Sequence, residues 1–343
     1  MKRIRSVITL LFFYSMLWHA VGARAQSPPV VVRAGHLPNI THAQALLGQA
    51  NGAFEKELAP RARVEWRIFA AGPSVIEAIF AGQLDLAYVG PNPAINGFIR
   101  SEGQALRIVA GAASGGAALI VRGDSGIQGP EDFHGKRVAS PQLGNTQDVA
   151  LRAWLKSHGM TPAERGGDVR VIPVASPDQI TLFLRKQIDA AWAPEPWASR
   201  LIHQAGGRML LDERTLWPKG RFVTAHLIVR TDFLRQHRDL VLEWVRVHRE
   251  LTEWLHKNPE QAKAILNQEI RRETGTSLPE NILNDALSRL EFTYDPLQST
   301  LLKAADQAFE TGMLGRRKPN LNGIYDLSVL NQILQEKGAP PFQ

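Results

Sequence analysis

The sequence predicts an α/β protein with two similar lobes, joined by two crossing segments and followed by C-terminal helices. The main observation is a stretch that occurs twice, at residues 82–94 and 186–198. Each copy has a short apolar run, an aromatic residue, Pro-x-Pro and then Ala. Because Pro suits the first turn of a helix and cannot continue a central strand, each copy indicates a buried strand that turns into a helix.

The similarity extends upstream of both copies. Ser74 lies eleven residues before Asp85, and Asp178 lies eleven residues before Asp189. Both spans are typical of an N-capped amphipathic helix. The alternative is that Leu/Ile-Asp-x-Ala is only a common way to enter a buried strand. Two such lobes would enclose a cleft at the carboxyl ends of their strands, where open α/β sheets bind ligands.

The remaining elements follow from hydrophobic periodicity and from Gly and Pro positions. The predicted strands are 30–35, 63–70, 84–89, 106–111, 118–122, 136–140, 168–173, 188–193 and 221–230. Helices are predicted to begin at 41, 74, 147 and 178 and to cover 234–257, 259–272, 279–291, 298–311 and 327–337. Residues 112–117 are expected to form a loop of small residues.

The N-terminus has the features of an export signal. Lys2, Arg3 and Arg5 precede an apolar stretch at 7–18 that is too short to span a bilayer, and Ala25 ends a small-x-small cleavage site. The alternative is an uncleaved membrane anchor. No later stretch approaches a transmembrane length, so the mature protein is expected to be soluble.

The domain boundaries follow from the two crossings, which would form a hinge near 118–122 and 222–229. A signal peptide is expected over 1–25. The first lobe is expected over 26–119 and 227–343, and the second lobe over 120–226.

The composition narrows the function. The formal net charge is +7, and four of these charges lie in the signal peptide, which leaves +3 for the mature chain. This excess, without a Lys/Arg run among aromatics, does not favour nucleic acid. The chain has no cysteine, which excludes disulfides, cysteine-ligated metals, thiol catalysis and a lipid-modified cysteine. An exported chain with neither a disulfide nor a lipid anchor fits the periplasm of a Gram-negative cell.

Motifs for catalysis and for metals are absent from the sequence. There is no His-Glu-x-x-His, no paired-carboxylate signature and no metal-ligand spacing. Ser114 is not in Gly-x-Ser-x-Gly, because position 112 is Ala. Gly115 and Gly116 form neither a Walker nor a dinucleotide loop. We therefore expect no catalysis, no metal and no cofactor.

Several polar and aromatic residues are expected at the cleft. Asn145 and Thr146 begin a helix whose free N–H groups favour an anion, although they could be an ordinary cap. For the other candidates, the alternative to a role in ligand binding is an ordinary role as a turn, core or solvated residue. They are Pro38, Asn39, His42, Ser74, Asn92, Ser114, Trp192, Glu195 and His226.

A family resemblance rests on four motifs. They are Arg-Ala-Gly-His-Leu-Pro-Asn-Ile-Thr-His-Ala from 33, Ala-Gly-Pro-Ser-Val-Ile-Glu-Ala from 71, Gly-Gln-Leu-Asp-Leu-Ala-Tyr-Val-Gly-Pro-Asn-Pro-Ala from 82, and Ala-Pro-Glu-Pro-Trp-Ala-Ser from 193. The mature chain resembles the nitrate/sulfonate/taurine-type substrate-binding proteins of ABC importers, a group that also holds pyrimidine-precursor binders. The resemblance implies a type II periplasmic-binding-protein fold. It implies ligand contacts from Pro38, Asn39, Ser74, Asn92, Ser114, Asn145, Thr146, Trp192, Glu195 and His226. The basic side chains that some nitrate binders use have no match here, which favours a sulfonate over nitrate.

The expected function is capture of a small oxyanion, such as an aliphatic sulfonate or taurine, by a monomer that delivers it to an inner-membrane permease with its ATPase. Neutral donors and helix N-termini would hold the anion. One alternative is a heteroaromatic solute such as a thiamine-pyrimidine precursor, stacked on Trp192 or Tyr88. A pyrimidine-forming enzyme of the same fold would need a cysteine-rich motif, which is absent, and would lack an export signal.

Glu195 would repel a bare oxyanion. We therefore expect it either to meet an amine of the solute or to turn away and bond the backbone of its own loop.

Overall fold

Two mixed sheets form the framework of the computed structural model, which describes residues 28–343. Both sheets belong to one compact unit, Val31–Gln343. The predicted signal peptide and its cleavage site after Ala25 lie outside the described residues. No helix in the described part of the chain is long and apolar enough to cross a membrane.

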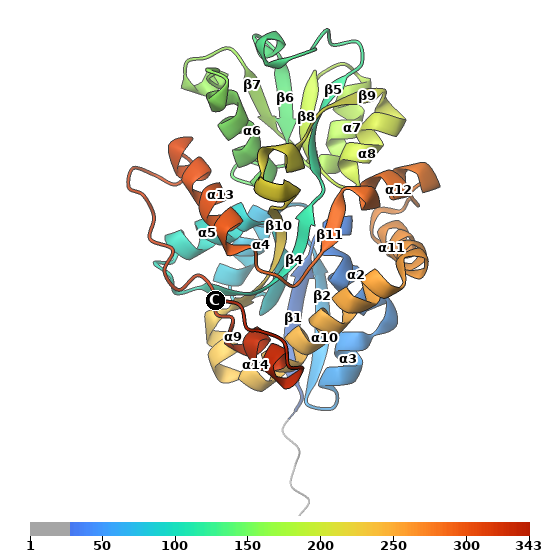
Figure 1. Ribbon diagram of the computed structural model, residues 1–343, viewed down its shortest axis with the longest axis vertical. Coiled ribbons are helices and arrows are strands. Elements are labelled where there is room, and N and C mark those ends of the chain that lie inside the picture. The colour runs from blue at the N-terminus through green and yellow to red at the C-terminus, as the bar shows by residue number, and fades with distance from the viewer. Residues whose placement is uncertain (1–27) are drawn as a thin grey trace, which may run out of the picture. The chain divides into compact units, whose positions relative to one another are not determined.

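The larger sheet has six strands in the order β11-β4-β10-β3-β1-β2 (Figure 1). β1 pairs with β3 in parallel, and β10 pairs antiparallel with both β3 and β4. The strands are β1 (Val30–His36), β2 (Ala62–Ile68), β3 (Leu86–Val89), β4 (Leu106–Gly115), β10 (Val223–Arg230) and β11 (Leu290–Phe292).

The smaller sheet has five strands in the order β7-β6-β8-β5-β9. β6 pairs in parallel with β7 and β8, whereas β5 runs antiparallel to β8 and β9. The strands are β5 (Ala117–Arg122), β6 (Arg137–Ser140), β7 (Arg170–Pro173), β8 (Ala190–Pro194) and β9 (Gly207–Asp212).

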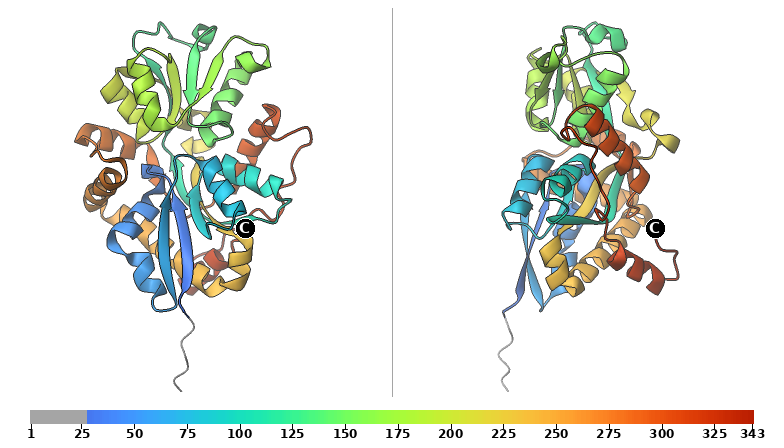
Figure 2. Two further views of the ribbon diagram at one scale, coloured as in Figure 1. Left: turned by 180° about the vertical axis from the view of Figure 1, so that it is seen from behind. Right: turned by 90° about the vertical axis from the view of Figure 1, so that its left-hand side faces the viewer.

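Helices cover both sheets. α4 and α5 lie on one side of the six-stranded sheet, and α2 and α3 lie on the other (Figures 1 and 2). With the larger sheet are α2 (Ala43–Asn51), α3 (Ala53–Leu58), α4 (Gly72–Phe80) and α5 (Pro91–Arg100), and with the smaller sheet are α6 (Thr146–Ser157), α7 (Ser176–Leu184) and α8 (Trp197–Ala205). The C-terminal helices are α9 (Thr231–Gln236), α10 (Arg238–Lys257), α11 (Pro259–Thr274), α12 (Glu280–Ser288), α13 (Gln298–Glu310) and α14 (Ser328–Glu336). Of these, α12 packs against α8 and α13 packs against α6.

An ion pair repeats in the two sheets and supports the predicted duplication. Asp85 Oδ2 accepts bonds from the backbone N and the Nε of Arg33 at 3.0 and 2.9 Å. Asp189 Oδ2 accepts the same two bonds from Arg137, both at 3.0 Å. Both pairs are 52 residues apart in sequence. The aspartate of each Leu/Ile-Asp-x-Ala motif therefore links two strands of one sheet. Asp85 links the start of β3 to β1, and Asp189 links the start of β8 to β6.

The first connection between the sheets differs from the prediction. Residues 112–115 do not form a loop, because β4 continues to Gly115 and pairs with β10 and β11. The chain then turns at Gly115 and Gly116, with φ of 75° and 72°, and begins β5 at once. A Cβ at Gly116 would lie 2.2 Å from the Leu290 side chain, so this turn has no room for a larger residue.

The second connection runs from β9 to β10 through the short 3-10 helices η4 (Glu213–Leu216) and η5 (Pro218–Gly220). The chain therefore changes sheets at 116 and between 212 and 223. Both changes come a few residues before the predicted lobe boundaries at 119/120 and 226/227, which fall inside β5 and β10. β9 and β11 are strands that the hydrophobic pattern did not indicate.

Candidate functional site

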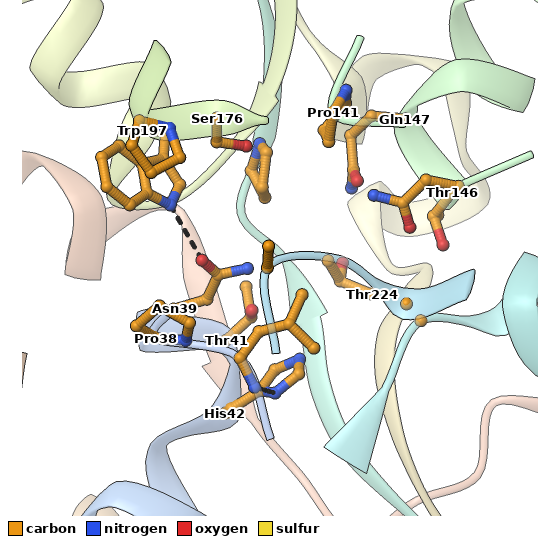
Figure 3. Close-up of a pocket in the computed structure, with 17 residues that line it drawn as sticks. Pro38, Asn39, Thr41, His42, Pro141, Thr146, Gln147, Ser176, Trp197 and Thr224 are labelled. Atoms are coloured by element: carbon orange, nitrogen blue, oxygen red, sulfur yellow. Dashed lines mark hydrogen bonds between the residues drawn. The ribbon is translucent and has the colours of Figure 1, made fainter. Parts of the chain in front are cut away.

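A cavity of about 50 Å³ lies where loops of the two sheets meet. One water needs about 10–15 Å³ by this measure, so the cavity has room for a group the size of a few waters. From the side of the larger sheet it is lined by Leu37, Pro38, Asn39, Thr41, His42, Ala70, Gly72, Gly90 and Thr224. From the side of the smaller sheet it is lined by Pro141, Asn145, Thr146, Gln147, Ser176, Pro177, Pro194 and Trp197 (Figure 3).

Five helices begin at this cavity. Its lining includes the first residue of α4, α6, α7 and α8 and the N-cap residue of α5, which is Gly90. In none of the five does the side chain of the N-cap residue bond to the helix. The sequence explains three of these starts, because α4, α5 and α7 each have Pro in the first two positions. Free N–H groups and the positive ends of five helix dipoles therefore converge on one space.

The cavity wall carries no ionised side chain. Among the described residues, those that line it include no Asp, Glu, Lys or Arg. His42 is its one titratable group, and burial, followed by the nearby His36, lowers the pKa of His42 to about 3. His42 Nδ1 accepts the Leu37 N–H at 3.1 Å, which leaves the proton on Nε2. His42 is thus a neutral donor.

Thr146 is the clearest free donor. Its Oγ1 is buried, and within residues 28–343 it has no hydrogen-bond partner. A buried hydroxyl without a partner is costly, which points to a ligand at this position. Gly90 lies opposite, and a Cβ there would come within 2.3 Å of Thr146 Oγ1. The two sheets therefore approach each other closely at this point.

Asn39 and Trp197 join the two sides of the cavity. Trp197 Nε1 donates to Asn39 Oδ1 at 2.8 Å, and the two residues are 7% and 3% exposed (Figure 3). Asn39 follows β1 of the larger sheet, and Trp197 begins α8 beside the smaller one.

The structure brings five of the eleven predicted site residues to the cavity: Pro38, Asn39, His42, Asn145 and Thr146. Four others lie elsewhere. Ser74 is exposed on α4. Asn92 Nδ2 donates to the Ala304 carbonyl at 3.4 Å, Ser114 Oγ accepts the Phe222 N–H at 3.2 Å, and His226 Nε2 bonds the Pro296 carbonyl at 2.9 Å.

Trp192 and Glu195 are also outside the cavity lining. Trp192 is fully buried in the core, and its Nε1 donates to Glu213 at 2.7 Å. Glu195 is fully buried; its Oε1 pairs with Arg289 at 2.7 Å and its Oε2 accepts the Ser199 N–H at 3.1 Å. Of the two arrangements expected for Glu195, it has the one that turns away, with Arg289 as an additional partner.

Sequence reasoning missed Thr41, Gln147, Ser176, Trp197 and Thr224 as lining residues. Gln147 lies in the first turn of a helix that was itself predicted, so the rule that ligands meet helix N-termini would have selected it. Ser176 begins α7 two residues before the start predicted at 178. Trp197 follows the second Pro-x-Pro and was the better choice of the two neighbouring tryptophans.

Solved structures share the fold. The alkanesulfonate-binding protein of Xanthomonas axonopodis pv. citri bound to MOPS superposes with a TM-score of 0.71 at 20% identity, covering 88% of this chain and 99% of that one. The periplasmic nitrate-binding protein of Synechocystis PCC 6803 gives 0.72 at 16% identity, covering 90% and 89%. A Candida albicans protein described as having the generic periplasmic binding protein structural fold gives 0.64 at 10% identity, covering 91% and 98%. The predicted periplasmic-binding-protein fold is confirmed.

Sequence relatives have names of the same kind. The taurine-binding periplasmic protein of Escherichia coli (strain K12) is 29% identical over 197 residues. The aligned segment is 57% of this chain and 58% of that relative, so the chain spans little more than half of the relative's length. A Bacillus subtilis (strain 168) protein named for binding aliphatic sulfonates is 25% identical over 294 residues, which cover 85% of this chain and 84% of that one. The model of the NMT1-like family matches residues 25–268. The chain belongs to the NMT1-like family.

Proposed function

We propose that this protein is the periplasmic solute-binding component of an ABC importer, which captures a small oxyanion, above all an aliphatic sulfonate. Delivery goes to an inner-membrane permease with its ATPase. The observation that carries the proposal is the convergence of five helix N-termini on a cavity without charged side chains.

Helix N-termini suit a solute that must be released. Each N-terminus acts as about half a positive charge, and its N–H groups bond oxyanions directly. The free hydroxyl of Thr146 and the N–H of His42 add neutral donors. Such a site holds an anion without an ion pair, so opening the cavity does not leave an unpaired buried charge.

A sulfonate matches this donor set better than nitrate does. Its three oxygens point in three directions from a tetrahedral sulfur, and the donors come from both sides of the cavity. The names of the taurine- and sulfonate-binding relatives support the same class. The two residues expected to stack on a heteroaromatic solute, Trp192 and Tyr88, are both buried in cores outside the cavity lining, which leaves Trp197 as the aromatic side chain at the cavity.

Capture is proposed to occur by closure of the two lobes about the connections at Gly116 and at residues 213–222. The Asn39–Trp197 bond and the close approach of Gly90 to Thr146 belong to the closed form. In the open form these groups would be solvated.

Calorimetric titration tests the proposal. The parent protein should bind propane-1-sulfonate and should not bind methanesulfonamide, which has sulfonyl oxygens without the charge. Thr146→Val removes one hydroxyl without changing shape and should cost about 1.5–3 kcal/mol, or about 10- to 100-fold in affinity. Thr181→Val, at an exposed position on α7, is the matched control and should change nothing. Equal binding of the sulfonamide, or no binding of any sulfonate, would contradict the proposal.

A further inference from the structure

We infer that the site accepts sulfonates with an uncharged tail and discriminates against those whose tail ends in an ammonium group, such as 2-aminoethanesulfonate (taurine). The inference rests on the proposed function and narrows its solute class. The inferred preference differs from that in the name of the taurine-binding relative. The reason is that no acidic side chain near the cavity is placed to bind an ammonium group.

A buried ammonium group needs acceptors, and a carboxylate above all. The described residues that line the cavity include no Asp or Glu. One lining amide oxygen, Asn39 Oδ1, already accepts the Trp197 N–H. An ammonium enclosed here would lose its water without gaining a countercharge.

Three carboxylates are next to lining residues in the sequence: Asp148, Asp178 and Glu195. Asp178 follows Pro177 and is exposed on α7, outside the lining. The other two are buried and bonded elsewhere.

Asp148 follows Gln147 and is fully buried. Its Oδ1 accepts from Ser140 at 2.7 Å, and its Oδ2 accepts from the Gly144 N–H at 2.9 Å and from Arg152 Nε at 3.0 Å. Its charge is therefore balanced within the lobe.

Glu195, which follows Pro194, is balanced in the same way. Its two oxygens bond Arg289 and the Ser199 N–H, and Arg289 also pairs with Asp285 at 2.7 Å. Moving Glu195 into the cavity would leave Arg289 without one of its two carboxylates and break a bond at the start of α8. Its present partners hold it away from a solute.

The field inside the cavity adds to this selection. Five helix N-termini open on the same space, and His42 presents a neutral N–H. The first turns of α4 and α5 contain no acidic residue, so the partial positive charge of these two N-termini is not offset within the helix. This charge and the N–H groups favour an anion and disfavour a cation. The attraction that holds a sulfonate therefore opposes an ammonium two carbons away.

Three solutes of equal size test the inference on the parent protein. Propane-1-sulfonate, 2-hydroxyethanesulfonate and taurine differ only in a terminal methyl, hydroxyl or ammonium group. Calorimetric titration should give at least tenfold tighter binding for the first two than for taurine. Taurine binding as tight as propane-1-sulfonate would overturn the inference and leave the proposed function standing. No binding of any of the three would instead overturn the proposed function.

A single carboxylate should reverse the preference. The amide end of Gln147 points into the cavity, and Gln147→Glu preserves its shape (Figure 3). Glu is also favourable in the first turn of a helix, so α6 should still form. The ratio of taurine affinity to propane-1-sulfonate affinity should rise at least tenfold.

Glu195→Gln is the matched control, because it removes a carboxylate that lies beside the cavity without lining it. The affinity ratio of the two solutes should stay the same, even if closure becomes weaker for both. A ratio that falls in Glu195→Gln would show that Glu195 serves an ammonium group and would overturn the inference. So would a Gln147→Glu protein that still binds propane-1-sulfonate with an unchanged ratio.

Discussion

Trp197 Nε1 donates to Asn39 Oδ1 at 2.8 Å, across 158 residues of sequence, and thereby joins the two sides of the cavity. Both side chains are buried, so the bond is shielded from water. In the closure proposed above, this bond would be made as the lobes close. It would then link solute capture to closure, because a solute that fills the cavity is enclosed by the same two residues.

Loss of this bond should weaken capture. Trp197→Phe keeps an aromatic ring but removes the N–H, and it should cost about 0.5–1.5 kcal/mol of binding free energy for propane-1-sulfonate, because closure loses one buried bond. Titration calorimetry measures the effect. Trp192→Phe removes a similar bond, to Glu213, outside the cavity. That control should lower Tm and leave the affinity unchanged. Equal affinities in the two variants would show that the bond to Asn39 does not contribute to binding.

Gly90→Ala should prevent full closure. The φ of Gly90 is −69°, which Ala also adopts, so each lobe should fold normally. The added Cβ would lie 2.3 Å from Thr146 Oγ1 and hold the sides apart. We expect at least tenfold weaker binding. Small-angle scattering should show that saturating propane-1-sulfonate reduces the radius of gyration of the parent protein but not that of the variant. Normal compaction in Gly90→Ala would contradict the closed form described above.

Sulfonate binding should not depend on pH between 5 and 8. His42 is the one titratable side chain among the described lining residues, and burial places its pKa at about 3. A sulfonate also stays ionised throughout this range. Titrations at four pH values should give one Kd. Tighter binding as the pH falls through 6.5 would mean that His42 gains a proton with the anion and is not a neutral donor.

Stability, in contrast, should depend on pH through Glu213. Burial raises the pKa of Glu213 from 4.5 to about 7, against the opposing bonds from Trp192 and Trp217. Because the folded state holds this proton more tightly than the unfolded state, the contribution is complete below pH 4.5 and is lost as the pH rises to 7. The loss amounts to about 3 kcal/mol.

Glu213→Gln stays neutral and avoids that loss. Its free energy of unfolding, relative to the parent protein, should rise between pH 5 and pH 8 in urea titrations. The same change at the exposed Glu250 should give a difference that is flat with pH. A flat difference for Glu213→Gln as well would show that Glu213 is ionised in the folded protein at neutral pH.

Export should remove residues 1–25. Arg24 and Ala25 end the predicted cleavage site, so N-terminal sequencing of periplasmic material should begin at Gln26. The protein should be released by osmotic shock. Material that begins at Met1 and stays with membranes after a salt wash would indicate an anchor instead.

The sequence by itself determined the duplicated α/β plan. Local rules were sufficient, because Pro-x-Pro after an apolar run favours the end of a strand and the start of a helix, as at α5 and α8. Asp85 and Asp189 stood in equivalent positions before any pairing was known, and the structure shows each bonded to an arginine 52 residues earlier. The prediction that Asn145 and Thr146 meet a ligand at a helix start rested on the same local rules.

The tertiary structure alone decided which of these groups share one cavity. Trp192 and Trp197 are five residues apart, yet one is buried against Glu213 and the other bonds Asn39 across the cavity. Glu195 faces away because Arg289, 94 residues later, occupies one of its oxygens. The position of each of these side chains depends on a partner that it meets only when the chain is folded. The spacing of residues within one segment therefore cannot predict it.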